Sequence, residues 1–292
     1  MAPHIEIIGR ERCQLGESPV WDPLLKRLFW VDARAPAIWS YDPETGDQTS
    51  LSAPDMVGSI VLGETGRLVA GLRHEVCRVD LAAGVFTPLA RPAAMLAEER
   101  LNDGKTDRAG RYLTGSQHHA DGGRPEGRLY RFDRGGACEV LETGVEISNS
   151  ICFSPSGDRL YFADSLRQAI WTYAYDLETG QVGPRETLID TAPLNSAPDG
   201  ATVDAEGRLW VALVQSGQIA CITPDGNLER LIDCPVPFPS CPAFGGESLD
   251  VLYVTAISDS GGRLNTDHPA GGRLFAIEGL GARGIAETRC RL

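Results

Sequence analysis

Three oxygen-bearing side chains, far apart in the sequence, have the chemistry to hold one metal ion. They are Glu17, Asn149 and Asp199. Carboxylate and amide oxygens are the ligands that hard divalent cations prefer, whereas a typical zinc site would contain His or Cys. Two carboxylates in a confined space also repel each other and resist ionisation unless a cation lies between them. These residue types therefore predict an oxygen-ligated divalent cation, provided that the fold brings them together.

Each of these residues also has a simpler interpretation. Asp-Gly and Asn-Asp-Gly are common turn sequences, and a lone Asn or Asp usually caps a turn. Polar residues at the mouth of a channel could also do no more than bind water. The two interpretations differ in whether the three residues occupy equivalent positions in the fold, which depends on the elements that carry them.

The elements come from a repeat. Six times in 292 residues the chain gives a turn, a basic or polar residue, and a short apolar and aromatic run. The aligned apolar residues are Leu28, Leu68, Tyr112, Leu160, Leu209 and Leu252. Their intervals run from 40 residues (28 to 68) to 49 residues (160 to 209), and a period in the forties is typical of propeller blades.

Each copy of the repeat includes one strand before this run and two after it, which makes four strands per blade. The sequence therefore predicts an all-β protein, a six-bladed β-propeller of four-stranded blades that forms a single domain over residues 1–292. The strand-like residues 5–8 precede the first copy. We expect this N-terminal strand to become the outermost strand of the last blade and to close the ring, because propellers hide their edges in this way.

The innermost strand of each blade lines the channel, so equivalent positions of successive copies form a ring. We take the position four residues before the apolar residue that precedes the first hairpin turn. It is occupied by Glu17, Gly58, Asn102, Asn149, Asp199 and Ser240. No member of this inner ring is apolar, although the strands that follow are strongly apolar. The pattern favours the metal hypothesis, with Glu17, Asn149 and Asp199 as ligands.

At these positions the chain resembles a known family, that of gluconolactonase, regucalcin (senescence marker protein) and the luciferin-regenerating enzyme. The matching segments are residues 15–21, 100–107, 148–151, 198–204 and 244–246. The resemblance implies a six-bladed propeller with one divalent cation in its channel, bound by Glu17, Asn149 and Asp199. It also implies substrate contacts from Arg100 and Asn102. Calcium, zinc, magnesium, manganese or ferrous iron occupies the site in different members.

The chain departs from the family pattern in two places. The family asparagine is usually followed by glycine, and here Ser150 follows Asn149. Some animal members also have a substrate-contacting glutamate in the third blade, which has no clear counterpart in residues 115–127. These departures leave the identity of the substrate open.

Many family members hydrolyse sugar lactones, so we expect a metal-dependent sugar lactonase that converts an aldonolactone to the sugar acid. Hydrolysis of a lactone passes through a tetrahedral oxyanion, which a Lewis acid stabilises. Asp199 is the best candidate for the general base, or else it orients the attacking water. Two alternatives stay open: a regucalcin-like cation-binding protein, and a hydrolase that acts on another ester at the same site.

The resemblance implies a small-molecule partner, a sugar lactone, and the composition argues against larger ones. The net charge is −13 and no basic stripe occurs, which argues against nucleic acid. No apolar run approaches the 18 residues of a membrane span, and no signal peptide is evident, so we expect a cytoplasmic protein, either a monomer or a weak oligomer. The eight cysteines include no CxxC pair and are expected to be free thiols.

Two segments are candidate covers for the channel. One is the glycine-rich loop that contains His118 and His119, and the other is the polar segment 258–268. The alternative interpretation is that the histidines are inert and that the second segment is a long hairpin loop.

Overall fold

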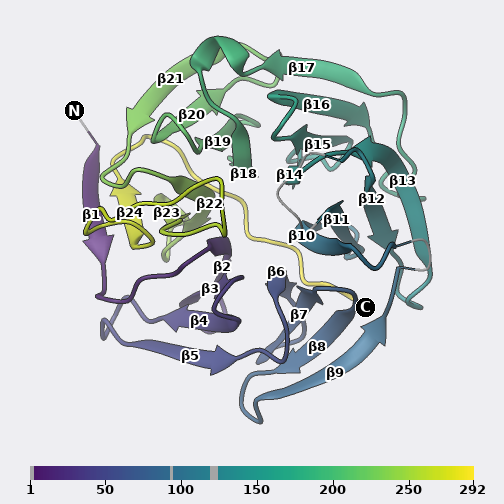
Figure 1. The fold of residues 1–292 in the computed structure, drawn as a ribbon, viewed down its shortest axis with the longest axis horizontal. Helices are drawn as coiled ribbons and strands as arrows, with labels where there is room; N and C mark the ends of the chain where they lie inside the picture. Colours follow the sequence, from purple (N-terminus) through teal and green to yellow (C-terminus); the bar gives the residue numbers. More distant parts are fainter. Residues whose placement is uncertain (1–2, 93–94, 119–123) are drawn as a thin grey trace.

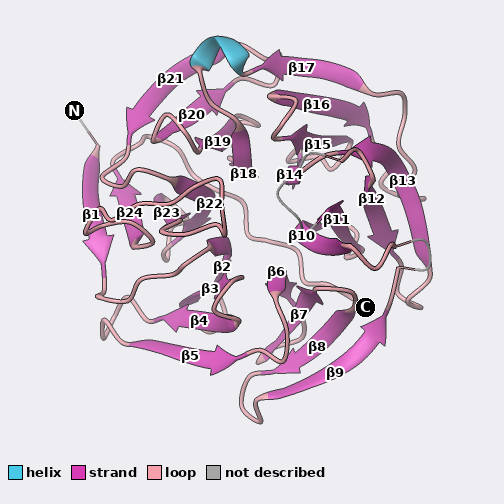
Figure 2. Ribbon diagram, in the orientation of Figure 1, coloured by secondary structure: helices cyan, strands magenta, loops and turns pink. Residues whose placement is uncertain are grey.

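Six four-stranded antiparallel sheets form a ring in the computed structural model, which describes residues 3–92, 95–118 and 124–292 (Figures 1 and 2). This confirms the predicted all-β, six-bladed propeller. Nearly every described element is a strand; a single turn of 3-10 helix, Ala192–Leu194, joins two blades. The described residues contain no helix with the length and apolar character needed to cross a membrane.

The strands of each blade run in chain order from the channel outward. Blade 1 is β2 (Gly16–Asp22), β3 (Arg27–Asp32), β4 (Ala37–Tyr41) and β5 (Gln48–Ser52). Blade 2 is β6 (Val57–Leu62), β7 (Arg67–Leu72), β8 (Val76–Asp80) and β9 (Val85–Ala90). Blade 3 is β10 (Glu99–Thr106), β11 (Tyr112–His118), β12 (Gly127–Phe132) and β13 (Cys138–Val145).

The second half of the chain repeats this order. Blade 4 is β14 (Ser148–Phe153), β15 (Arg159–Asp164), β16 (Ala169–Ala174) and β17 (Glu186–Asp190). Blade 5 is β18 (Pro198–Val203), β19 (Leu209–Leu213), β20 (Gln218–Ile222) and β21 (Leu228–Asp233). Blade 6 is β22 (Pro239–Gly245), β23 (Val251–Ala256), β24 (Leu274–Glu278) and, from the start of the chain, β1 (His4–Ile8).

The ring is closed as predicted. Strand β1 pairs antiparallel with β24, from His4 opposite Glu278 to Ile8 opposite Leu274. Closure therefore joins the first strand of the chain to its last strand, β24, in one sheet (Figure 1).

Apolar side chains between neighbouring blades make the scaffold rigid. Trp210 of blade 5 meets Phe244 of blade 6 edge to face at 5.8 Å, and Trp21 of blade 1 stacks on Tyr253 of blade 6 at 6.1 Å. Because each blade buries one face against the next, the aromatic positions of the repeat form the core. The polar ends of the inner strands are thereby held at fixed positions around the channel.

The innermost strand of every blade has an irregularity in its pairing with the second strand. In β2 the two residues of the bulge, Ser18 and Pro19, follow Glu17, whereas in β18 Asp199 is itself the first residue of the bulge. Bulges change the direction of side chains at the ends of strands. These irregularities fall at the inner ring and so direct its side chains.

Residues 279–292 cross the ring at the mouth where the inner strands end (yellow trace in Figure 1). The backbone of Cys290 donates a hydrogen bond to Leu62 at 2.7 Å, and that of Arg291 donates to Gly110 at 2.9 Å. Near the channel, Glu287 lies 3.2 Å from the ammonium group of Lys105, and both side chains are mostly buried. This tail covers the hairpin end of the channel and was not predicted from the sequence.

Candidate active site

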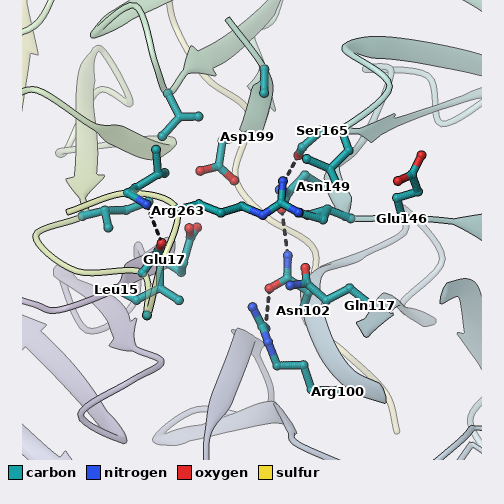
Figure 3. Close-up of a pocket in the computed structure, with 18 of the residues that line it drawn as sticks. Leu15, Glu17, Arg100, Asn102, Gln117, Glu146, Asn149, Ser165, Asp199 and Arg263 are labelled. Atoms are coloured by element: carbon teal, nitrogen blue, oxygen red, sulfur yellow. Dashed lines mark hydrogen bonds between the residues drawn. The ribbon is translucent and has the colours of Figure 1, made fainter. Parts of the chain in front are cut away.

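A pocket of about 420 Å³ lies at the mouth of the channel where the inner strands begin. Its walls include all five residues singled out from the sequence: Glu17, Arg100, Asn102, Asn149 and Asp199 (Figure 3). They come from β2, β10, β14 and β18, so the repeat brings together residues up to 182 positions apart in the chain (17 to 199).

Two members of the predicted inner ring do not line this pocket. Gly58 packs against blade 3 so closely that a Cβ atom would lie 2.6 Å from the carbonyl oxygen of Asn102. The hydroxyl of Ser240 is buried 2.9 Å from that of Thr255. These two positions serve packing between blades, and the functional part of the ring is the remaining four residues.

Glu17 and Asp199 form a carboxylate pair with little support from the protein. Asp199 is 7% exposed, and among the described residues none donates a hydrogen bond to its carboxylate. Burial raises the pKa of Asp199, and the nearby charge of Asp103 raises it further, against the opposing effect of Arg100. Burial, followed by the charges of Asp199 and Asp103, likewise raises the pKa of Glu17 well above its usual range.

Asn149 is held by hydrogen bonds that fix the direction of its amide. Its Nδ2 donates to the hydroxyl of Ser165 at 2.8 Å, and that hydroxyl donates to the carbonyl of Pro198 at 2.7 Å. Its Oδ1 accepts a hydrogen bond from Nδ2 of Asn102 at 3.0 Å. A carbonyl oxygen has two lone pairs, so the oxygen of Asn149 keeps one for a ligand in the pocket.

Arg100 and Asn102 continue the same chain of hydrogen bonds. The guanidinium of Arg100 donates to Oδ1 of Asn102 at 2.6 Å and to the carbonyl of Leu101 at 3.2 Å. The Asn102 amide also donates to the carbonyl of Ser148 at 2.9 Å, which ties blade 3 to blade 4. Burial lowers the pKa of Arg100 to about 10, so the guanidinium remains charged at neutral pH.

The donor set of Glu17, Asn149 and Asp199 fits a hard divalent cation. Two carboxylates that share one pocket and both have raised pKa values need a positive charge between them, and the amide oxygen completes an all-oxygen set. The described residues contain no group of three or more His, Cys, Asp and Glu side chains arranged to bind a metal. This set differs from such a group because its third oxygen comes from an amide.

Comparisons with known proteins show the family to which the chain belongs. The chain matches the SMP-30/Gluconolactonase/LRE-like region over residues 15–258. The chain belongs to this family. Among its relatives, a pentonolactonase of Haloferax volcanii is 36% identical, with 95% of this chain and 94% of the relative covered. The regucalcin of Gallus gallus is 33% identical, with 96% of both chains covered.

Solved structures of the family have the same fold. A luciferin-regenerating enzyme superposes with a TM-score of 0.91 at 28% identity, over 100% of both chains. A calcium-binding regucalcin from Agrobacterium tumefaciens gives a TM-score of 0.92 at 26% identity, over 100% of this chain and 99% of that one. The resemblance stated from the sequence is therefore confirmed.

The serine that replaces the usual family glycine after Asn149 adopts a backbone conformation that suits glycine. Ser150 has φ of 55°, and Ser18, which follows Glu17 in blade 1, has φ of 51°. The hydroxyl of Ser150 donates to the backbone carbonyl of Asp199, which contributes to holding a conformation that side chains disfavour. The departure from the family pattern thus leaves the bulge in place.

Two aspartates at the ends of second strands hold the segments that lead into β2 and β14. Asp32 accepts hydrogen bonds from the backbone N–H groups of Gln14 (2.7 Å) and Leu15 (3.1 Å). Asp164 accepts the equivalent bonds from Glu146 (2.9 Å) and Ile147 (3.1 Å). Blades 1 and 4 are those in which the ring residue, Glu17 or Asn149, precedes the bulge, so these bonds help to set the position of both.

Several pocket residues were missed because they do not belong to the inner strands. They lie at the end of the second strands or just after it, five or six residues after the aligned apolar residue of each copy: Arg34, Arg73, Gln117, Ser165, Val214, Gln215 and Ile257. We call this set the outer ring. The same repeat alignment that gave the inner ring could have found it. The Oε1 atom of Gln117 is buried and has no hydrogen-bond partner within the described residues. This oxygen can therefore accept a hydrogen bond from a ligand.

The two predicted covers differ in what is known of them. His118 lines the pocket, and His119 lies outside the described residues. In the segment 258–268, Asp259 bridges to Asn265 as in a hairpin, and Ser260, Gly261, Arg263 and Leu264 line the pocket. Figure 3 shows Arg263 extended over the pocket, so this segment is both a hairpin loop and one wall of the site.

Proposed function

We propose that this chain hydrolyses a sugar lactone to the sugar acid, with a divalent cation bound by Glu17, Asn149 and Asp199. The observation that carries the proposal is the pair of carboxylates with raised pKa values, Glu17 and Asp199, beside Arg100 in a pocket of about 420 Å³. A pocket of this size suits a small molecule. Membership of a family that includes a pentonolactonase supports the proposal.

When bound, the cation would act as a Lewis acid on the lactone carbonyl; calcium, zinc, magnesium, manganese and ferrous iron are the candidates. The protein residues handle the proton. Asp199 accepts a proton from the attacking water as the new C–O bond forms, and returns it to the ring oxygen as the ring C–O bond breaks. In the alternative form of the mechanism, Asp199 orients the water instead.

Arg100 and Asn102 act in binding rather than in proton transfer. Hydrogen bonds to neighbouring carbonyl and amide oxygens fix the side chains of Arg100 and Asn102. Both side chains line the pocket with their remaining donors. They would hydrogen-bond the sugar hydroxyls or the ring oxygen, and so hold the carbonyl carbon near Asp199. Gln117 offers an acceptor for a further hydroxyl.

A cation-binding protein without enzymatic activity is the second candidate, because the matched relatives include several regucalcins. The outer ring favours catalysis over this candidate, since a protein that only bound a cation would not need a pocket lined with arginine and glutamine. Hydrolysis of another ester at the same site is the third candidate, and the substrate panel below separates it from the first.

The test uses metal-stripped protein and a panel of 1,4- and 1,5-aldonolactones, with each divalent ion added back. We expect at least one lactone to open faster than it does spontaneously, and Asp199→Ala to abolish that activity. Asp225→Ala is the matched control, because Asp225 is an exposed turn residue of the same blade outside the pocket. Activity on aryl esters alone would favour the third candidate, and cation binding without any turnover would favour the second.

A further inference from the structure

The pocket is rich in positive charge although the protein is acidic. Four arginines line it, together with three carboxylates, in a chain of net charge −13: Arg34, Arg73, Arg100 and Arg263, with Glu17, Glu146 and Asp199. A divalent cation held by two of these carboxylates would make the interior more positive still. Arg34 and Arg73 each have an acidic partner outside this set, Asp259 and Asp55, so Arg100 is the arginine whose charge needs an explanation.

Arg100 is the strongest sign of a missing anion. It is 9% exposed, and no carboxylate of the described residues lies within 4.0 Å of its guanidinium, which bonds only to two carbonyl-type oxygens. A buried arginine is normally paired with an acid. Its neighbour is a second arginine, because Leu101 donates a backbone hydrogen bond to the carbonyl of Arg73 at 2.9 Å.

Arg73 lies close enough to affect Arg100 electrostatically. Burial is the main reason that the pKa of Arg100 is lowered; the negative charge of Glu17 opposes this effect, and the positive charge of Arg73 adds to it. Arg73 has one acidic partner, Asp55, 3.2 Å from its Nε, and its side chain is about one-third exposed. The rest of its guanidinium is available on the pocket side, where two like charges lie near each other.

The opposite wall of the pocket carries two more arginines, Arg34 and Arg263. Arg34 is held loosely, 3.8 Å from Asp259 and 3.4 Å from Gln14. Arg263 extends over the pocket from the segment 258–268 (Figure 3). Arginine is the side chain best suited to bind an oxyanion, through two parallel hydrogen bonds of its planar fork.

We propose that the substrate lactone carries an anionic group, a carboxylate, and that Arg73 binds it beside Arg100. This inference rests on the proposed lactonase function and narrows its substrate class from neutral aldonolactones to acidic ones. A phosphate would present the same anionic oxygens, and the experiment separates the two.

The test compares lactones that differ only in charge. Galactono-1,4-lactone and galactaro-1,4-lactone share one ring, and a carboxylate replaces the terminal CH₂OH in the second. Glucono-1,5-lactone and its 6-phosphate form the corresponding phosphate pair. For each pair kcat/KM is measured with the activating ion present, for wild type, Arg73→Gln and Arg91→Gln. Arg91 is the matched control: it is in the same blade, 2.8 Å from Glu75, exposed and outside the pocket.

We expect wild type to prefer the carboxylate lactone over its neutral partner by about tenfold or more, which is the value of one charge-assisted hydrogen-bonded pair. Arg73→Gln should reduce that ratio about tenfold, and Arg91→Gln should not change it. Added salt should also reduce the preference of wild type for the carboxylate lactone.

Three outcomes would overturn the inference. Equal or better turnover of neutral lactones in wild type would remove the anionic substrate while leaving the proposed function intact. A ratio unchanged in Arg73→Gln would remove Arg73 from the site. Preference for the 6-phosphate over the carboxylate would replace carboxylate with phosphate. If no lactone of either pair is opened with any ion, the proposed function fails, and this inference fails with it.

Discussion

Replacing Asp199 with asparagine should stabilise the protein when no cation is bound. The carboxylates of Glu17 and Asp199 share one pocket, both have raised pKa values, and no described residue donates a hydrogen bond to the carboxylate of Asp199. Asparagine has the same shape without the charge. The Asp199→Asn variant should therefore lose the repulsion between the carboxylates, and with it the affinity for the cation.

The magnitude follows from the cost of ionising a buried acid. Burial, together with the charge of Asp103, raises the pKa of Asp199 from 3.8 to about 8. Each pKa unit corresponds to about 1.4 kcal/mol, so avoiding the buried charge by taking up a proton at pH 7 costs about 4 kcal/mol. Water that enters the open side of the pocket reduces this cost. We expect the variant to gain about 2 kcal/mol, or about 5 °C in Tm for a chain of this length.

The sign of the pH dependence is fixed by the direction of the shift. Because the folded-state pKa of Asp199 lies above the unfolded value, the folded protein binds the proton more tightly. Its contribution to stability is complete below about pH 4 and is lost as the pH rises toward 8. The advantage of Asp199→Asn should therefore be absent at pH 4, grow through pH 6 and be largest at pH 8.

The assay is thermal unfolding in a chelator and again with saturating divalent ion. With the ion, wild type should gain about 3 kcal/mol at one hundred times its Kd, and Asp199→Asn should gain little. Asp103→Asn is the control: Asp103 is also an acid of an inner strand, but its two oxygens accept hydrogen bonds from Gly104 and Ile151, both at 2.8 Å. An amide nitrogen there would face an N–H group, so this variant should be less stable. A chelated Asp199→Asn protein that melts at or below wild type at pH 8 would refute the reasoning.

Two further predictions concern the scaffold around the site. Lys105→Met should lower the free energy of unfolding in urea by about 2 kcal/mol, because it leaves the mostly buried Glu287 with only a distant arginine partner. Adding Glu287→Leu should recover part of the loss, and a loss that is not recovered would contradict the ion-pair argument. Ser150→Gly should change the free energy of unfolding by less than about 1 kcal/mol, since relief of the left-handed strain offsets the lost hydroxyl bond, whereas Ser150→Val should cost about 2 kcal/mol or more; a tolerated valine would show that the backbone there is not constrained.

The fold was predictable because the sequence pattern of one blade occurs six times in the chain. Aligned apolar residues such as Leu28 and Leu160 pair with the inner strands at equivalent places, so one alignment fixed both the blades and the start of each inner strand. The N-terminal strand was predictable for a related reason, since an unpaired first strand in a closed ring has one sheet left to join. These are consequences of local periodicity.

The parts that the sequence did not predict depend on contacts without a period. The tail that covers the hairpin end of the channel occurs once, and its link from Glu287 to Lys105 joins residues with no repeated context. Gly58 and Ser240 occupy the right repeat position but face neighbouring blades, which only the packing decides. The outer ring was within reach of the alignment, but its members Arg34 and Gln117 share no residue type and so gave no chemical signal alone.

The need for an amide at position 102 follows from the two charges that meet there. On one side Oδ1 of Asn102 accepts from Arg100, and on the other Nδ2 donates to Oδ1 of Asn149, beside the carboxylates of Glu17 and Asp199. An aspartate would satisfy the arginine but lose the donor and add a third negative charge to the acidic pair. A leucine would leave both Arg100 and Asn149 without their partner. Only a side chain that both accepts and donates lets the arginines and the carboxylates share one pocket without pairing directly, and this separation keeps each set available to a ligand of opposite charge.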